Sequence, residues 1–123
     1  MAYNQPFSPQ GNTVKLQTNG TANTVNSTQI QASDFGMSVL PNQYMLISNA
    51  TADIWVVFAT TAAIAAAAAF PTAGTTTPGT AQPGFRLKPG VIMVVTFGAN
   101  PLYVGNISTG VSQSFDITPG EGS

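Results

Sequence analysis

Residues 43–59 read Gln43-Tyr44-Met45-Leu46-Ile47-Ser48, then Asn49-Ala50-Thr51-Ala52-Asp53, then Ile54-Trp55-Val56-Val57-Phe58-Ala59. The first and third runs are rich in β-branched and aromatic residues, which are enriched in strands. The middle run holds small and polar residues that are typical of a loop. The pattern therefore predicts two strands, and we interpret them as a hairpin with a five-residue loop.

The second of these strands is apolar on both faces. Because side chains alternate along a strand, Ile54, Val56 and Phe58 share one face, whereas Trp55 and Val57 share the other. A second sheet would bury one face only. The other face must then meet a loop, the Ala-rich segment that follows or a neighbouring subunit.

Further short strands are expected on both sides of this region. Val14 and Leu16 alternate with polar residues before Asn19-Gly20, a dipeptide that favours a two-residue hairpin turn, and Val25 lies on the returning side. Another edge strand is expected around residues 29–32, and residues 37–40 lead to a turn at 41–42. Further strands are expected at residues 85–90, 91–97, 102–107 and 114–117, the last of them ended by 119–122. Seven to nine short strands at this spacing predict an all-β protein, an antiparallel β-sandwich or jelly roll.

Domain organisation follows from the length of the chain and from two segments that lack the alternation of apolar and polar residues expected in a strand. A chain of 123 residues is expected to form one domain. We assign residues 1–12 to an extended N-terminal arm, because Pro6, Pro9 and Gly11 disfavour regular structure around Phe7. Residues 13–123 form the single β-sandwich domain. The arm is either a frayed tail or a segment that lies on a neighbouring subunit with Phe7 as its anchor.

The second such segment is a long Ala/Thr/Pro/Gly-rich insertion at residues 61–84. Residues 62–69 have high helix propensity and predict one or two helical turns before Pro71. The rest, around Pro78, predicts an irregular loop. This insertion is either a solvated excursion or a segment that reaches an adjacent subunit or covers the Trp55 face. Arg86 and Lys88 follow it, as edge-strand charges that prevent sheet pairing or as contacts to an acidic neighbour.

Charge is scarce throughout the chain. Lys and Arg together number three, Asp and Glu four, and there is no His or Cys. His, Cys and clustered carboxylates are the usual acids, bases, nucleophiles and metal ligands. The first two are absent and the four acids are scattered in the sequence, so we expect no enzyme, no metal and no cofactor. Three cations are too few for a nucleic-acid partner. Neutral hydroxyl and amide groups can be buried in an interface at a small desolvation cost, which favours a protein made for assembly.

Residues 54–70 carry no charge and approach the length of a membrane span. Their second half is mostly Ala, however, and no Lys or Arg stands nearby to fix an orientation, so we expect no membrane partner. Residues 1–7 show no signal peptide, and we expect the protein to be made in the cytoplasm.

Three stretches carry a resemblance to a known class of proteins: residues 44–58, the strand at 85–90, and the Phe-Asp-Ile-Thr-Pro-Gly-Glu-Gly ending at 115–122. The chain resembles the small all-β virion proteins of tailed bacteriophages, most closely the cement or decoration proteins of the head. The resemblance implies a jelly-roll-like structural protein on the virion head surface. Its partners would be the major capsid protein, whose capsomers it bridges, and neighbouring copies of itself as a homo-oligomer.

The sequence offers candidate interface residues but no catalytic ones. They are Phe7, Pro9, Trp55, Pro78, Arg86, Lys88 and Tyr103. Trp55 has a second interpretation as a core residue of its strand. The alternative function is a receptor- or carbohydrate-binding β-sandwich of a phage tail, fibre or spike, in which Tyr3, Tyr44, Trp55 and Tyr103 would provide aromatic contacts beside Asn and Gln side chains.

Overall fold

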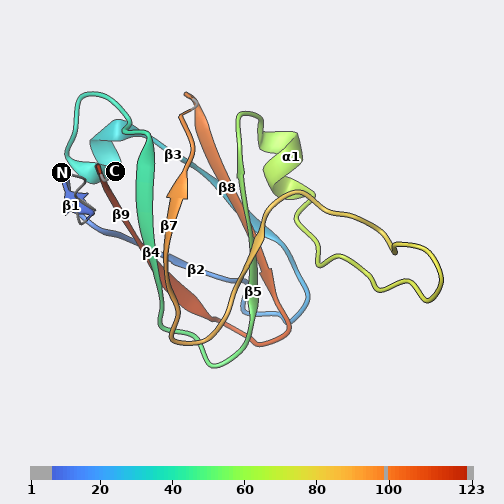
Figure 1. Ribbon diagram of the computed structural model, residues 1–123. Coiled ribbons are helices and arrows are strands. Elements are labelled where there is room, and N and C mark those ends of the chain that lie inside the picture. The colour runs from blue at the N-terminus through green and yellow to red at the C-terminus, as the bar shows by residue number, and fades with distance from the viewer. Residues whose placement is uncertain (1–6, 99, 122–123) are drawn as a thin grey trace, which may run out of the picture.

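Two antiparallel sheets pack face to face in the computed structural model, which describes residues 7–98 and 100–121 (Figure 1). The larger sheet, sheet A, contains β1 (Ser8–Pro9), β2 (Val14–Gln17), β4 (Gln43–Ser48), β7 (Ile92–Thr96) and β9 (Ser114–Glu121). Sheet B contains β3 (Asn26–Ile30), β5 (Ile54–Ala59), β6 (Phe85–Leu87) and β8 (Leu102–Ser108). A 3-10 turn, η1 (Ala32–Phe35), and a short helix, α1 (Ala62–Ala66), complete the described elements.

Strand pairing follows a nested pattern. β5 pairs with β6, β4 with β7, β3 with β8 and β2 with β9, all antiparallel. Successive pairs alternate between the two sheets, which is the winding of a jelly roll. The predicted all-β antiparallel sandwich of seven to nine strands is confirmed.

The predicted hairpin at residues 43–59 is wrong. β4 lies in sheet A between β7 and β9, whereas β5 lies in sheet B between β6 and β8. The five-residue loop crosses the roughly 10 Å between the packed sheets instead of reversing the chain within one. The Gln113 side-chain oxygen holds this loop by accepting a hydrogen bond from the Thr51 N–H at 2.7 Å.

Two other local expectations are also wrong. Asn19-Gly20 does not close a hairpin, because β2 pairs with β9 and β3 with β8, although Asn19 Oδ1 accepts a hydrogen bond from the Thr21 N–H at 2.9 Å in a local turn. The last strand does not end at Ile117 but continues to Glu121. Pro119 has no N–H to donate, but its carbonyl accepts a hydrogen bond from the Gln10 N–H at 2.9 Å. The antiparallel pairing of β9 therefore continues with β1.

The main core lies between the inner faces of the two sheets. Tyr44 is fully buried there, and its hydroxyl donates a hydrogen bond to the Pro41 carbonyl at 3.1 Å. Burial raises the pKa of the Tyr44 hydroxyl to about 12, because the phenolate would lose its hydration. The other buried core residues are Ile30, Phe35, Leu46, Ile54, Val56, Leu87, Leu102, Val104, Phe115 and Ile117.

Candidate functional site

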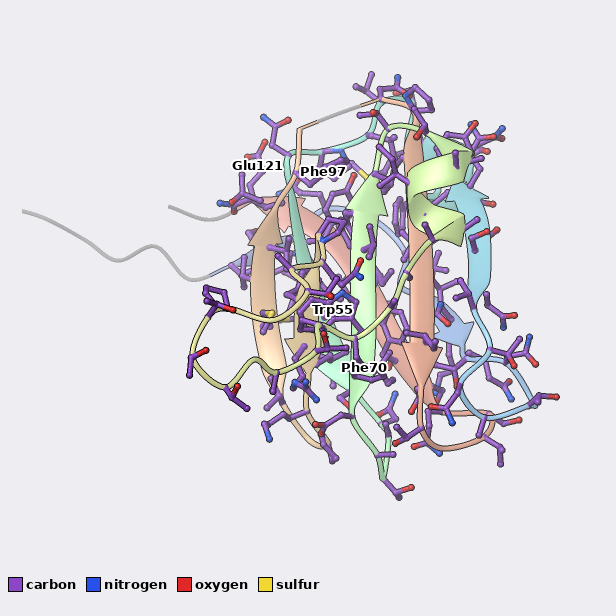
Figure 2. All side chains as sticks on the ribbon, turned by 90° about the vertical axis from the view of Figure 1, so that its right-hand side faces the viewer. Trp55, Phe70, Phe97 and Glu121 are labelled. Carbon is purple, nitrogen blue, oxygen red and sulfur yellow. The ribbon has the colours of Figure 1, made fainter. Side chains whose placement is uncertain are left out.

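The outer face of sheet B is covered by the chain itself. Trp55, only 8% exposed, forms a second apolar cluster with Val57 on β5 and with Ala65 and Ala68 from the Ala-rich segment. Trp55 and Phe70 lie 6.1 Å apart between ring centroids, and Figure 2 shows them side by side on this face. We call this surface the covered face. The structure thus confirms that the second apolar side of β5 needs a cover, and it identifies the Ala-rich segment as that cover.

Two glycines make this close cover possible. A Cβ placed on Gly105 of β8 would lie 1.9 Å from the Ala65 carbonyl oxygen, so only glycine lets α1 approach the sheet. Gly84 has a φ of +111°, and its added Cβ would meet the Val56 carbonyl oxygen at 2.4 Å. Nearby, the Trp55 Nε1–H donates a hydrogen bond to the Pro83 carbonyl at 2.8 Å. Both ends of the insertion are therefore fixed to the covered face.

The middle of the insertion behaves differently from its ends. Residues 72–80 are all exposed, and they project away from the sandwich between α1 and β6 (Figure 1). The Thr72 N–H donates to the Thr80 carbonyl at 3.1 Å and closes the base of this excursion. Each of the two alternatives for residues 61–84 holds for a part of the segment. Its ends cover the Trp55 face, and its tip around Pro78 is exposed to solvent. A contact between the tip and another subunit stays a prediction.

All three cations of the chain lie within 4.0 Å of one of its own carboxylates. Arg86 on β6 contacts Asp53 at 2.8 Å, and Lys88 reaches the same carboxylate at 4.0 Å. The Arg86 guanidinium also lies 5.1 Å from the centroid of Phe70 and 5.8 Å from that of Trp55. Arg86 therefore seals the edge of the covered face. Lys15 pairs with Asp116 at 3.6 Å.

Over β4 and β7, the outer face of sheet A has no such cover within residues 7–98 and 100–121, although Phe7 lies against Gly120 of β9. Met45 and Ile47 of β4 point outward beside Val94 and Ile92 of β7, because the register pairs Met45 with Val94 and Ile47 with Ile92. Ile92 is 66% and Val94 49% exposed, while Met45 and Ile47 are half-buried. We call these four side chains, with the polar residues around them, the open face. Its rim consists of Lys15, Gln43, Thr96 and Asp116, while Thr118 in the same outward row is buried and hydrogen-bonded to Thr13.

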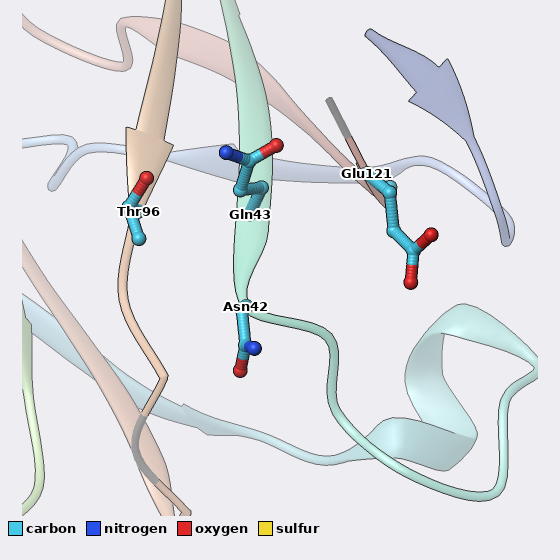
Figure 3. Close-up of a pocket in the computed structure, with 5 residues that line it drawn as sticks. Asn42, Gln43, Thr96 and Glu121 are labelled. Carbon is cyan, nitrogen blue, oxygen red and sulfur yellow. The ribbon is translucent and has the colours of Figure 1, made fainter. Parts of the chain in front are cut away.

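A pocket of about 350 Å³ lies at one end of the open face (Figure 3). Asn42, Gln43, Thr96, Gly120 and Glu121 line it. The Gln43 Oε1 atom is buried and has no hydrogen-bond partner among the described residues. The lining can accept and donate hydrogen bonds through amide, hydroxyl and carboxylate groups, and it includes no aromatic ring on which a sugar could stack.

The seven predicted interface residues do not form one surface. Arg86 and Lys88 lie around Asp53, and Trp55 lies under the Arg86 guanidinium. Tyr103 packs against the covered cluster further along sheet B. Pro78 lies in the exposed tip. Their role at an interface stays a prediction, although burial of Trp55 supports its interpretation as a core residue.

The N-terminal arm lies on its own sheet where the structure describes it. Ser8 and Pro9 pair with Glu121 and Gly120 as β1, and Phe7 packs on Gly120, where an added Cβ would lie 2.4 Å from its ring. The expected arm begins at residue 1, but residues 1–6 lie outside the described residues. Phe7 anchors the arm within its own chain, and its contact with a neighbouring subunit stays a prediction.

Sequence reasoning missed the open face, although a signal for it exists. The run at 91–97 is apolar at consecutive positions, as is the run at 44–47, so both strands carry apolar residues on two faces. The run at 91–97 repeats the pattern of residues 54–58, but a cover was expected only for β5. Applied to β4 and β7, the pattern selects Met45, Ile47, Ile92 and Val94 as a second apolar surface that needs a partner.

Neither helical segment of the described chain is long and apolar enough to cross a membrane. Within that same part of the chain, no three acidic side chains gather where they could hold a metal ion. Comparisons of the chain with protein-family models, with curated proteins and with solved structures found no match.

Proposed function

We propose that this protein is a non-enzymatic structural component of a phage virion, a capsid cement or decoration protein that binds the outer head surface and bridges neighbouring capsomers. The observation that carries the proposal is the contrast between its two outer faces. The ends of the insertion cover one apolar face, whereas no segment of the described residues covers the apolar side chains of the other. An uncovered apolar surface on an otherwise well-packed domain is typical of a protein-binding site.

The scarcity of charge supports this choice of partner. The open face has apolar side chains at its centre and amides and hydroxyls around them, so burying it requires little desolvation of charge. Its ionised neighbours, Lys15 and Asp116, already contact one another. Such a surface binds with little dependence on salt. Many copies that each make a modest contact would together stabilise a shell by simultaneous engagement.

The alternative, a receptor- or carbohydrate-binding module of a tail, fibre or spike, has support from the pocket beside Gln43 and Glu121. Of the aromatic residues named for it, Tyr3 lies outside the described residues, and Tyr44, Trp55 and Tyr103 do not line this pocket. Tyr44 is fully buried, and Trp55 is held under Phe70 and Arg86. Neither ring is free to stack on a sugar, which leaves the alternative weaker than the structural role.

Gold-labelled antibody imaging of intact particles from the source lysate tests the proposal. We expect label distributed over the whole head. Label confined to tails or fibres would favour receptor binding, and particles without label would contradict a virion role altogether. Glycan binding that survives replacement of Glu121 and Gln43 would exclude the pocket as the sugar site.

A further inference from the structure

One strand of the open face also forms an edge of its sheet. Sheet A runs in the order β1, β9, β4, β7, with β2 also on β9, so β7 has a single neighbour in the described structure. An edge strand presents N–H and C=O groups that no neighbouring strand satisfies, and these can pair with another chain. β7 is therefore a place where the sheet can be extended.

The ladder between β4 and β7 shows which backbone groups face outward. The Phe97 N–H donates to the Asn42 carbonyl at 2.8 Å, and the Ser48 N–H donates to the Val91 carbonyl at 2.9 Å. Since hydrogen-bonded positions alternate along an antiparallel pair, the odd-numbered residues of β7 face β4. The backbone groups of Ile92, Val94 and Thr96 consequently point away from the sheet, toward the open edge.

β7 lacks the features that usually protect such an edge. Ile92–Thr96 contains no charged residue, proline or glycine. The edge of sheet B differs, because β6 is only three residues long, includes Arg86 and is followed directly by Lys88 and Pro89. Charges and prolines of this kind block strand addition. Among the described residues, charges and a proline thus protect the β6 edge, whereas the β7 edge has no such protection.

We infer that the β7 edge binds β7 of a second copy of this chain, antiparallel and across a two-fold axis at Val94. Val94 then lies opposite Val94 of the second copy, and Ile92 lies opposite Thr96. Each of these positions has outward backbone groups, so the three residue pairs each exchange two hydrogen bonds. The two sheets A become one continuous sheet, and the two open faces become one surface.

The strand that pairs with the β7 edge comes from a second copy of the chain, because this edge is complementary to itself. A two-fold interface brings each group near its own counterpart, so a charge at the axis would repel its copy. The nearest charged side chain in the rows that cross Ile92 and Val94 is Asp116, which is two strands away and paired with Lys15. Two-fold pairing also closes after two copies, whereas pairing of β7 with another edge of the sheet would continue into a filament.

The contact is short, and the pairing in solution is therefore weak. A five-residue strand pair buries less than the roughly 1,200 Å² of a stable interface. On a shell, where copies are held close together, the same contact gains from their high effective concentration. The inference deepens the proposed function by naming the partner of one edge of the open face.

Thiol cross-linking of purified protein tests the inference. Because the chain has no native cysteine, only the introduced thiol can react. Val94→Cys is treated at high protein concentration with a short bifunctional methanethiosulfonate reagent. Paired strands hold these Cα atoms about 5.5 Å apart, so we expect at least about tenfold more covalent dimer than with the control Val39→Cys. Val39 is a matched control, because it is 70% exposed and lies far along the chain from β7.

The register is tested by two further variants. A mixture of Ile92→Cys and Thr96→Cys should give the covalent heterodimer, whereas Ile92→Cys alone should give no more dimer than Val39→Cys. Equal dimer from Val94→Cys and Val39→Cys would overturn the inference, and so would efficient dimer formation by Ile92→Cys alone. Trp55 emission verifies that each variant is folded. Because no particle is used, these results are independent of whether the protein is found on a phage head.

Discussion

Both outer faces of this sandwich carry apolar side chains, but only one of them is covered by a described segment of the chain. Sheet B carries Trp55 and Val57 outward, and sheet A carries Ile92 and Val94 outward. The chain covers the first pair with α1 and the ends of an insertion, but it places no described segment over the second. Burying apolar area stabilises the isolated fold when the cover is part of the same chain, and it drives association when the cover is a partner. The covered face should therefore govern folding, and the open face should govern binding.

Replacing the ring at the centre of the covered face should have the largest effect. Trp55→Ala removes a buried ring and its hydrogen bond to Pro83, and we expect the free energy of unfolding to fall by about 3–5 kcal/mol. Urea unfolding followed by circular dichroism measures this. Ile92→Ala, on the open face, should change stability by about 0.5 kcal/mol or less. Equal effects of the two substitutions would remove the distinction between the faces.

Gly105→Ala should push the cover away without altering any apolar side chain. The added methyl would lie 1.9 Å from the Ala65 carbonyl oxygen, and we expect a loss of about 1–3 kcal/mol with a red shift of Trp55 emission. Trp55 is the only tryptophan, so its fluorescence reports on this face alone. Gly20→Ala is the matched control, since its nearest neighbour would be 3.7 Å away. Unshifted emission in Gly105→Ala would mean that α1 does not pack as described.

Alkaline pH should weaken the main core through Tyr44. Its pKa is about 12 in the folded protein against about 10 when unfolded, so the folded state holds this proton more tightly. The resulting stabilisation is complete below pH 10 and is lost as the pH rises from 10 to 12, by about 2 kcal/mol. Unfolding in urea across this range measures the loss. Tyr44→Phe should be less stable at pH 8 but should lack this part of the alkaline decline; an identical decline in both proteins would exclude Tyr44 as its cause.

The smallest effect is expected at the rim of the covered face. Arg86→Met keeps an apolar stem over Phe70 but loses the contacts with Asp53 and the aromatic rings, and we expect a loss of about 1 kcal/mol or less. The difference from wild type should shrink as salt is added, because these charges are partly exposed. A difference that salt leaves unchanged would assign the role of Arg86 to packing instead of charge.

Sequence patterns predicted strands well and their partners poorly. The doubly apolar run at 54–58 correctly required a second cover, and the Ala-rich segment was among the candidates. Adjacent strands were paired as hairpins, however, because residues 43–48 and 54–59 have the same local pattern whether they share a sheet or face each other across the core. Pairing in a jelly roll joins residues far apart, such as Val14 and Ile117, and no local window contains that information.

The candidate site was harder to predict than the fold. Exposure of Ile92 and Val94 depends on β7 being an edge with no described segment across its outer side, and that is a property of the assembled topology. Some of the aromatic and cationic residues that suggested an interface make contacts within the chain, with Arg86 over Phe70 and beside Asp53, and their role at an interface stays a prediction.

Occupancy of variants on phage heads tests the central claim most directly. Ile92→Glu places a charge on the open face, and Val111→Glu places one at a similarly exposed position outside it. Both should fold, as judged by wild-type Trp55 emission. If the open face binds the capsid, heads will retain Val111→Glu at wild-type levels and lose most of Ile92→Glu. Equal occupancy of the two variants would contradict the account.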